Sequence, residues 1–183
     1  MPDTDTVLVE RDGPVTIVSI NRPHCRNAVD GATARKLYDV FRAFDADADA
    51  SVAVFTGTGG TFCAGADLKA VAAGDPDKRR EIGGHDSIAP MGPSRLRLSK
   101  PVIAAVNGVA ITGGFELALA CDLIIASTRA RFADTHARVG VIPGWGLSQR
   151  LSRASGIGRA KLLSLTGNFL DAETAERWGL VSL

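Results

Sequence analysis

Hydrophobic and polar positions change their spacing several times along this chain, and each change predicts a new element. Two apolar runs, VLVE and VTIVSI, flank an Asp-Gly turn at 12–13, which is typical of a β-hairpin. Apolar residues then recur every three or four positions from Leu37 to Phe44, with Asp30 placed to cap a helix. The apolar run at 52–55 predicts a further strand. The chain therefore begins with the order β-β-α-β.

A glycine-rich stretch, GTGGTFCAGADLK at 57–69, follows this strand and leads into a short helix from about Asp67. Residues from about 74 to 95 lack clear periodicity and are rich in Gly, Asp, Pro and Arg, so we expect a mobile loop there. A second cycle begins at KPVIAAVNG, where the continuous apolar run predicts a buried strand. ITGGFELALA again places glycines at the start of a helix, and DLIIAS is the strand after it.

The remaining sequence predicts mainly helices. They lie in LSQRLSRA and GRAKLLSLTG, and then in DAETAERWG, with Asp171 as its cap and Gly179 as its stop. LVSL at 180–183 predicts a last strand. Strand, glycine turn and helix thus occur twice, so two helix N-termini offer free backbone N–H groups that could point into one site.

Composition limits the kind of protein. With 183 residues, 45% of them hydrophobic and 22% charged, residues 1–183 are expected to form one globular domain. The net charge of +1 comes from 21 basic and 20 acidic residues without a basic cluster, which argues against a nucleic-acid partner. The start, MPDTDTVLVE, does not look like a signal peptide, and no apolar run could span a bilayer. We therefore expect a soluble enzyme or small-molecule binder.

The cysteines give no sign of a disulfide framework or a zinc site. Cys25, Cys63 and Cys121 are far apart and have no CxxC spacing, which favours a reducing, cytoplasmic location. Cys63 lies in the glycine loop and could in principle be a nucleophile. Its neighbours in sequence include no histidine or other base, so a small buried apolar residue is the favoured interpretation.

The glycine loop has the general form of a phosphate site, because backbone N–H groups at a helix start attract negative charge. A dinucleotide fingerprint that starts at Gly57 meets Phe62 where its third glycine should be. A P-loop that starts at Gly60 meets Ala66 and Asp67 where Lys and Ser or Thr should follow. Both nucleotide motifs fail, yet the backbone donors remain and suit a smaller or more transient negative charge.

The second glycine turn carries a carboxylate. Gly113 and Glu116 are three residues apart at the start of a predicted helix, on the same side of it. If an N–H group of the first loop converges with that of Gly113, the two could bind one oxygen as its charge develops, with Glu116 moving a proton beside it. Glu116 could instead be a solvated carboxylate that favours the helix dipole. Its apolar neighbours, GF and LALA, favour burial and a function.

Four ordered stretches resemble one known family. They are SINRPHCRNA at 19–28, FCAGADLKA at 62–70, KPVIAAVNGVAITGGFELALACD at 100–122 and FADTHARVGVIPGWGLSQRL at 132–151. Together they resemble the successive signatures of the enoyl-CoA hydratase/isomerase (crotonase) family and, with the spacing between them, cover nearly all of the chain. The resemblance implies an α/β fold, a crotonase-like spiral of β-β-α repeats. It also implies acyl-CoA thioester substrates and an enolate-like intermediate held in an oxyanion hole.

The resemblance also implies roles for single residues. The backbone N–H groups of Ala66 and Gly113 match the two oxyanion donors, and Glu116 matches a catalytic glutamate. The other matching positions bind substrate: Ala64 receives the CoA adenine, Ala66, Asp67, Leu68 and Lys69 line the thioester, and Arg26 and Ala28 border the CoA arm. Arg26 and Lys69 have an alternative interpretation as solvated surface charges.

One departure from the family pattern concerns the chemistry. Hydratases of the family carry a second glutamate where this chain has Thr135 and His136. Histidine titrates near neutrality and can accept or donate a proton, so His136 could replace the missing acid, or it could be structural. Asp134 is a less favoured replacement. His24 and His85 lie in predicted loops and are expected to be exposed.

A second departure concerns length. Chains of the family continue past a strand like GLVSL into a helical C-terminal segment that covers the active site and builds trimers. That segment is absent from these 183 residues. We expect a homotrimer or hexamer when the segment is present and poor association without it.

The leading hypothesis is a lyase that adds water reversibly to trans-2-enoyl-CoA thioesters, with no metal and no cofactor apart from the CoA of the substrate. An enoyl-CoA double-bond isomerase with Glu116 as its single base is the nearest alternative. A thioesterase or a dehalogenase-like relative is also open. From another class, a non-catalytic acyl-CoA binding paralogue is a further alternative.

Overall fold

A computed structural model describes three parts of the chain: residues 5–74, residue 89 and residues 91–183. The strands are β1 (Val7–Asp12), β2 (Val15–Ile20), β3 (Val52–Gly57), β4 (Val102–Val106), β5 (Val109–Ile111), β6 (Leu123–Ala126), β7 (Arg131–Ala133) and β8 (Phe169–Asp171). The α-helices are α1 (Gly31–Ala46), α2 (Leu68–Ala72), α3 (Gly113–Ala120), α4 (Leu147–Ser155), α5 (Ile157–Thr166) and α6 (Ala172–Arg177). Short 3-10 helices are η1 (Pro23–Cys25), η3 (Pro93–Arg95) and η4 (Ala137–Val139).

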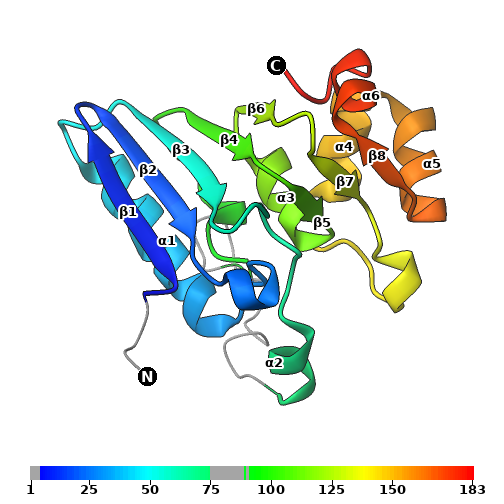
Figure 1. Ribbon diagram of the computed structural model, residues 1–183, viewed down its shortest axis with the longest axis horizontal. Helices are drawn as coiled ribbons and strands as arrows, with labels where there is room; N and C mark the ends of the chain where they lie inside the picture. The colour runs from blue at the N-terminus through cyan, green and yellow to red at the C-terminus, as the bar shows by residue number, and fades with distance from the viewer. Residues whose placement is uncertain (1–4, 75–88, 90) are drawn as a thin grey trace.

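The main sheet has five strands in the order β1-β2-β3-β4-β6. The predicted hairpin is confirmed: β1 and β2 pair antiparallel, and Gly13 occupies their turn with φ +53°. The pairs β2–β3, β3–β4 and β4–β6 are all parallel. A second sheet, β5-β7-β8, stands beside α3 among the C-terminal elements (Figure 1). The expected β-β-α order therefore recurs, once as β1-β2-α1 and again as β4-β5-α3.

Aspartate caps set the starts of three helices, and the sequence predicted two of these caps, Asp30 and Asp171. The Asp30 carboxylate accepts the N–H of Thr33 at 2.8 Å, and Asp171 accepts that of Thr174 at the same distance. Asp67 caps α2 by accepting N–H groups from its first turn. Each cap satisfies donors that have no partner inside the helix, which is why the sequence marks these starts so clearly.

Two features differ from the predictions. Residues 180–183 do not form a strand; Ser182 N–H donates to Ile124 and Leu183 accepts from Ala126, two bonds that run beside β6 without a ladder. The predicted mobile loop at 74–95 lies mostly outside the described residues. Its last part forms η3, because Pro93 presets the backbone of a first helical turn.

Candidate active site

The glycine loop is fixed by backbone pairing on one side and by Asn27 on the other. Cys63 pairs with β5, since its N–H donates to Val109 O and its carbonyl accepts from Ile111 N–H, each at 3.0 Å. The fully buried Asn27 amide donates to the carbonyl groups of Thr58 at 2.9 Å and Thr61 at 2.7 Å. The loop is therefore held in a single shape against the second cycle of the fold.

Close glycine contacts bring this loop to the start of α3. A Cβ on Gly114 would overlap the carbonyl of Cys63, and a Cβ on Gly65 would overlap the Thr112 hydroxyl and lie 3.2 Å from the nitrogen of Gly113. Gly65 also has φ +99°, a left-handed conformation that suits only glycine well. Two segments almost fifty residues apart therefore meet at backbone distance, as the sequence predicted for its two glycine turns.

This contact leaves two donors without partners. Within the described ranges, the N–H groups of Ala66 and Gly113 donate to no backbone or side-chain acceptor. The preceding residue, Thr112, adopts φ +49° at the start of α3, an uncommon conformation for a β-branched residue and a form of local strain often found at functional sites.

Both donors border a cavity of about 140 Å³. Its lining includes Ala64, Ala66, Leu68, Gly113, His136 and Trp145. A Cβ on Gly113 would come within 3.0 Å of Trp145 and of the sulfur of Met91, so these two side chains close off the space beside that donor. The site thus combines two backbone donors, a mostly apolar wall and one titratable side chain, His136.

Glu116 lies behind this cavity. Its side chain is fully buried, as its apolar neighbours in sequence predicted. One carboxylate oxygen, Oε1, accepts the N–H groups of Trp145 at 2.8 Å and Leu147 at 3.1 Å. The other oxygen, Oε2, has no hydrogen-bond partner in the part of the chain that the structure describes, and it faces Nε2 of His136 at 3.6 Å.

His136 connects Glu116 to a second buried carboxylate. Its Nδ1 lies 2.6 Å from Oδ1 of Asp134, which also accepts the backbone N–H of His136 at 3.3 Å. Burial alone would lower the pKa of the imidazole. The hydrogen bonds and charges of Asp134 and Glu116 outweigh burial and raise that pKa to about 9. For Asp134, burial raises the pKa, but the bond to His136 helps to lower it overall.

The residues predicted to bind the CoA part and the thioester differ in their exposure to solvent. Ala64 N–H donates to the carbonyl of Arg26 at 3.0 Å, so the first and second signatures touch here. Arg26 and Lys69 are exposed, as both interpretations of them require, and Ala28 is half-buried. Asp67 uses its carboxylate to cap α2 and to bind Arg22 at 3.2 Å. Neither Asp67 nor Lys69 is among the residues that line the cavity.

The predictions for His24 and Cys63 are confirmed, and the prediction for His85 is not tested. His24 is exposed, as predicted, whereas His85 lies outside the described residues. Cys63 is fully buried among apolar residues, which confirms the favoured interpretation. All three cysteines are free thiols.

Sequence reasoning missed the groups that hold Glu116. The N–H groups of Trp145 and Leu147 come from the PGWG segment, where Gly146 has φ +114° and α4 starts at the next residue. A glycine pair around a tryptophan before a helix was the available signal. Arg150 donates to the carbonyl of Trp145 at 2.9 Å and so steadies this turn.

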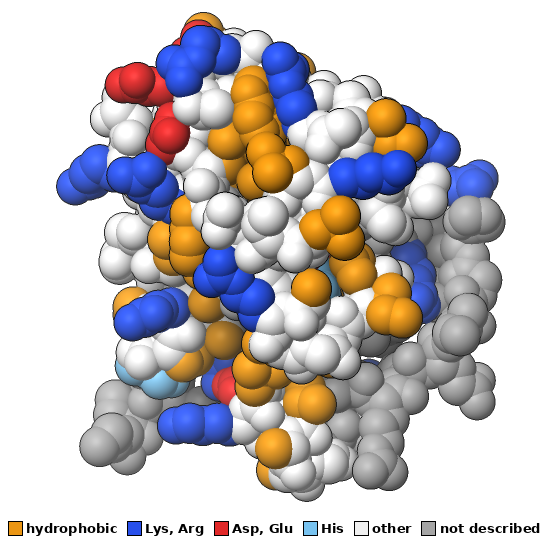
Figure 2. Space-filling model, turned by 90° about the vertical axis from the view of Figure 1, so that its right-hand side faces the viewer, with side chains coloured by type: hydrophobic (Ala, Val, Ile, Leu, Met, Phe, Trp, Pro, Cys, Tyr) orange, Lys and Arg blue, Asp and Glu red, His pale blue; other side chains and the backbone are white. Residues whose placement is uncertain are grey.

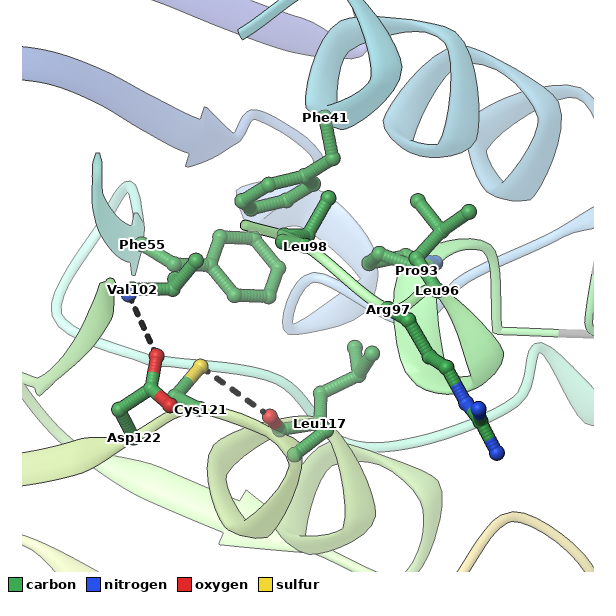
Figure 3. A pocket seen from close by; sticks show the side chains of 11 residues that line it. Phe41, Phe55, Pro93, Leu96, Arg97, Leu98, Val102, Leu117, Cys121 and Asp122 are labelled. Atoms are coloured by element: carbon green, nitrogen blue, oxygen red, sulfur yellow. Dashed lines mark hydrogen bonds between the residues drawn. The ribbon is translucent and has the colours of Figure 1, made fainter. Parts of the chain in front are cut away.

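A larger cavity, of about 280 Å³, lies between α1, α3 and the segment after η3 (Figure 3). Most of its lining residues are apolar, and two of its polar groups, Cys121 and Asp122, are engaged in hydrogen bonds. Asp122 accepts the N–H of Val102 at 2.8 Å, and burial raises the pKa of the Cys121 thiol to about 12. The cavity shares no lining residue with the site at Gly113 and offers no acid-base pair.

No group of His, Cys, Asp and Glu among the described residues has the arrangement of a metal site. In those same residues, no helix is both long and apolar enough to cross a membrane.

Comparison with known proteins identifies the family. A sequence model described as enoyl-CoA hydratase/isomerase matches residues 10–183. The chain therefore belongs to the enoyl-CoA hydratase/isomerase family, and the resemblance carried by the four signatures is confirmed.

Individual relatives agree with this assignment. The chain is 44% identical to an Arabidopsis thaliana protein named probable enoyl-CoA hydratase 1, peroxisomal, over 94% of this chain and 63% of the relative. It is 39% identical to the short-chain-enoyl-CoA hydratase of Clostridium acetobutylicum, over 98% of this chain and 69% of that protein. A crystal structure of an enoyl-CoA hydratase from Mycobacterium tuberculosis matches with a TM-score of 0.85 at 44% identity, over 97% of this chain and 73% of that one.

These matches confirm the expected crotonase-like α/β fold. They also show that the chain spans about two thirds of the length of the curated relatives it matches.

Proposed function

We propose that the protein is an enoyl-CoA hydratase, a lyase that adds water reversibly across the double bond of trans-2-enoyl-CoA thioesters. One observation carries the proposal: two unpaired backbone N–H groups meet at a cavity that His136 lines, with Glu116 directly behind it. The names of the relatives support the same reaction. Ala64, Arg26 and Ala28 would border the CoA part of the substrate, and Leu68 and Lys69 would line the thioester.

In the proposed mechanism, the N–H groups of Ala66 and Gly113 bind the thioester oxygen. Charge grows on that oxygen as a nucleophile attacks Cβ, so fixed donors stabilise the transition state more than the ground state. This polarisation makes Cβ electrophilic and allows the enolate-like intermediate to form. The cavity's apolar wall strengthens the effect, because electrostatic interactions are stronger where water is excluded.

Glu116 and His136 would share the proton transfers. Water adds its oxygen to Cβ and gives its proton to Glu116, while protonated His136 gives a proton to Cα as the enolate collapses. The product gains one hydroxyl and one hydrogen across the former double bond. The proton on Glu116 can then pass to Nε2 of His136, 3.6 Å away in the substrate-free site, and restore the starting state. The addition of water involves no net oxidation or reduction, and the mechanism calls for no cofactor beyond the CoA of the substrate.

The test is a comparison of three measurements on the purified protein. Hydration of crotonyl-CoA, followed by loss of the enoyl-thioester absorbance, is expected to exceed isomerisation of a 3-enoyl-CoA. Isomerisation without hydration would replace the proposal by the isomerase alternative. Binding of crotonyl-CoA in calorimetry, with neither reaction detectable, would favour a non-catalytic acyl-CoA binding protein. Series of short and long enoyl-CoAs would then define the preferred chain length.

We also infer that the protein assembles as a homotrimer or hexamer when the C-terminal segment typical of the family is present, and that an apolar face on α5 and β8 takes part in the packing. Ile157, Leu162, Leu165 and Phe169 are exposed there, with Leu165 79% exposed. Figure 2 shows hydrophobic groups interspersed with Lys and Arg side chains on the face viewed, and exposed apolar groups of this kind can mark an interface. Light scattering of a form that carries this segment, and of its Leu165→Lys variant, tests this, since the variant should have the lower mass at equal concentration.

A reducing, cytoplasmic location is part of the same proposal, supported by the three free thiols. Fractionation of cells that express the protein would test it.

A further inference from the structure

The two ring nitrogens of His136 face two different carboxylates. Nδ1 is 2.6 Å from Oδ1 of Asp134, and Nε2 is 3.6 Å from Oε2 of Glu116. All three side chains are almost completely buried. Asp134 follows β7 directly, whereas Glu116 belongs to the first turn of α3, so two separate elements position the carboxylates on opposite sides of the ring.

We propose that Asp134 is a positioning residue that fixes the His136 ring with Nδ1–H bound to its carboxylate and Nε2–H presented to Glu116 and the cavity as a proton donor. The geometry is independent of the reaction, whereas the use of the donor rests on the proposed hydratase function. From the sequence, Asp134 is only a less favoured substitute for the missing second glutamate, whereas the structure makes it the partner of His136.

The orientation follows from hydrogen-bond chemistry. An ionised carboxylate only accepts, so the short contact with Asp134 requires a proton on Nδ1. A neutral imidazole would then turn a bare Nε2 toward Glu116, leaving two acceptors facing each other in a buried site. A proton on Nε2 removes that repulsion. The imidazolium between two carboxylates is therefore the favoured form, and the raised pKa of His136, about 9, agrees with it.

Charged groups face the ring of His136 from two elements, and a third charged group lies behind one of them. Asp134 faces it from the end of β7 and Glu116 from α3. Arg150 of α4 interacts electrostatically with Glu116 and so acts on the ring only through that carboxylate. Among described groups, then, the two carboxylates dominate the field at His136, and both favour its cationic form.

A purely structural role for Asp134 makes a different prediction. Oδ1 of Asp134 also accepts the backbone N–H of His136, a contact that could simply close the turn after β7. An asparagine amide oxygen can accept both bonds and preserve that turn. It carries no charge, so it cannot stabilise an imidazolium. Asp134→Asn therefore separates a positioning and charging role from a structural one.

The experiment is a pH titration of histidine side-chain nitrogens by long-range ¹H–¹⁵N NMR. The chain has only three histidines, so His136→Gln identifies the signals of His136 directly. Wild-type His136 is expected to carry protons on both nitrogens at neutral pH and to titrate far above 6.5. In Asp134→Asn its pKa should fall back toward 6.5. Asp171→Asn, which alters a helix cap far along the chain from the ring, is the matched control and should leave the titration unchanged.

Kinetics supply the second readout. In Asp134→Asn, kcat for hydration should fall at least tenfold with KM little changed, and the loss of activity at high pH should begin at lower pH than in wild type. If wild-type His136 titrates near 6.5, or if Asp134→Asn leaves its pKa unchanged, the positioning role is overturned whether or not hydration is observed. If the NMR results are as expected but crotonyl-CoA is not hydrated, the proposed function fails and the positioning role stands. Circular dichroism shows whether the variant folds; if it does not, the wild-type titration alone decides.

Discussion

The two sides of the candidate site are built by different means. The donor wall consists of the backbone N–H groups of Ala66 and Gly113, and glycine contacts too close for any side chain fix its geometry. The acid-base wall consists of the side chains of Glu116, Asp134 and His136, fixed by hydrogen bonds and opposite charges. The donor wall therefore depends on shape alone, whereas the acid-base wall depends on protonation.

This contrast explains where the chain departs from the pattern of its family. Every residue has a backbone N–H group, so the donors themselves do not depend on side-chain type. Their positions depend on the close approach at Gly65 and Gly114, where a side chain would not fit. The acid-base wall needs two groups that exchange protons, and different residue types can meet that need. In the proposed mechanism His136 takes the place of the family's second glutamate, and the buried Asp134 beside it would supply the charge that keeps the ring protonated.

The largest expected effect comes from neutralising the acid-base wall. Glu116→Gln keeps an oxygen that can accept the N–H groups of Trp145 and Leu147, so the fold should survive. The base is lost, and kcat for hydration should fall by about a hundredfold to ten-thousandfold. KM should change little, because the CoA arm is bound elsewhere. Glu176→Gln, an exposed residue of α6, is the matched control. Turnover like wild type in Glu116→Gln would remove Glu116 from the mechanism.

The donor wall should be disrupted by a steric clash and not by a change of charge. In Gly65→Ala the new methyl group would overlap the Thr112 hydroxyl and press on the nitrogen of Gly113, so one donor must move. Loss of one such donor lowers kcat by about a hundredfold to a thousandfold. Gly60→Ala is the control within the same loop: it has the similar φ of +73° but open space around it. It should cost about 1 kcal/mol of stability and little activity. Equal losses of activity in both variants would show that the clash at Gly65 is not the cause.

These two walls also differ in how far the sequence predicts them. The glycine loop, the start of α3 and the burial of Glu116 are local patterns, and each was predicted within a few residues. The bond between Asp134 and His136 lies in an irregular turn without periodicity, so the pattern shows the residues but not which atoms meet. The support of Glu116 by the Trp145 and Leu147 N–H groups depends on the direction of a loop backbone, which side-chain identities do not encode.

Short elements were missed for a related reason. β5, β7 and β8 have three residues each, too few for an alternating pattern to stand out. The predicted last strand at 180–183 has the apolar composition of a strand, but only two hydrogen bonds beside β6 to hold it. Composition alone cannot reveal whether a neighbouring strand offers a complete ladder.

A smaller effect is expected in the pH dependence of the free energy of unfolding. The folded pKa of His136, about 9, lies above its ordinary value of roughly 6.5. The group therefore contributes stability that is complete below about pH 6.5 and is lost as pH rises through about 9. The difference corresponds to on the order of 3 kcal/mol. Urea unfolding at about pH 6 and about pH 10 should show wild type losing this much more than His136→Gln. Parallel losses in the two proteins would show that the ring is not charged in the folded state.

The smallest expected effect concerns how the donor wall is attached to the first cycle of the fold. Arg22 binds Asp30 at 2.8 Å and Asp67 at 3.2 Å, and it also donates to the carbonyl of Ala28. It thus links the caps of α1 and α2, and Asp67 directly follows the donor Ala66. Because both carboxylates keep their helix N–H partners and part of their exposure to water, losing the cation should be tolerated.

Arg22→Met should therefore lower the free energy of unfolding by about 1–2 kcal/mol, a loss typical of hydrogen bonds to charged groups. Arg22→Lys keeps the charge but cannot reach both carboxylates in the same planar geometry, so an intermediate loss is expected. Activity should fall much less than in Gly65→Ala, since glycine packing still holds Ala66 beside Gly113. Urea unfolding and hydration assays on the three proteins measure both quantities. If Arg22→Met matched Gly65→Ala in lost activity, the donor wall would depend on ion pairs as well as shape, and the contrast between the two walls would fail.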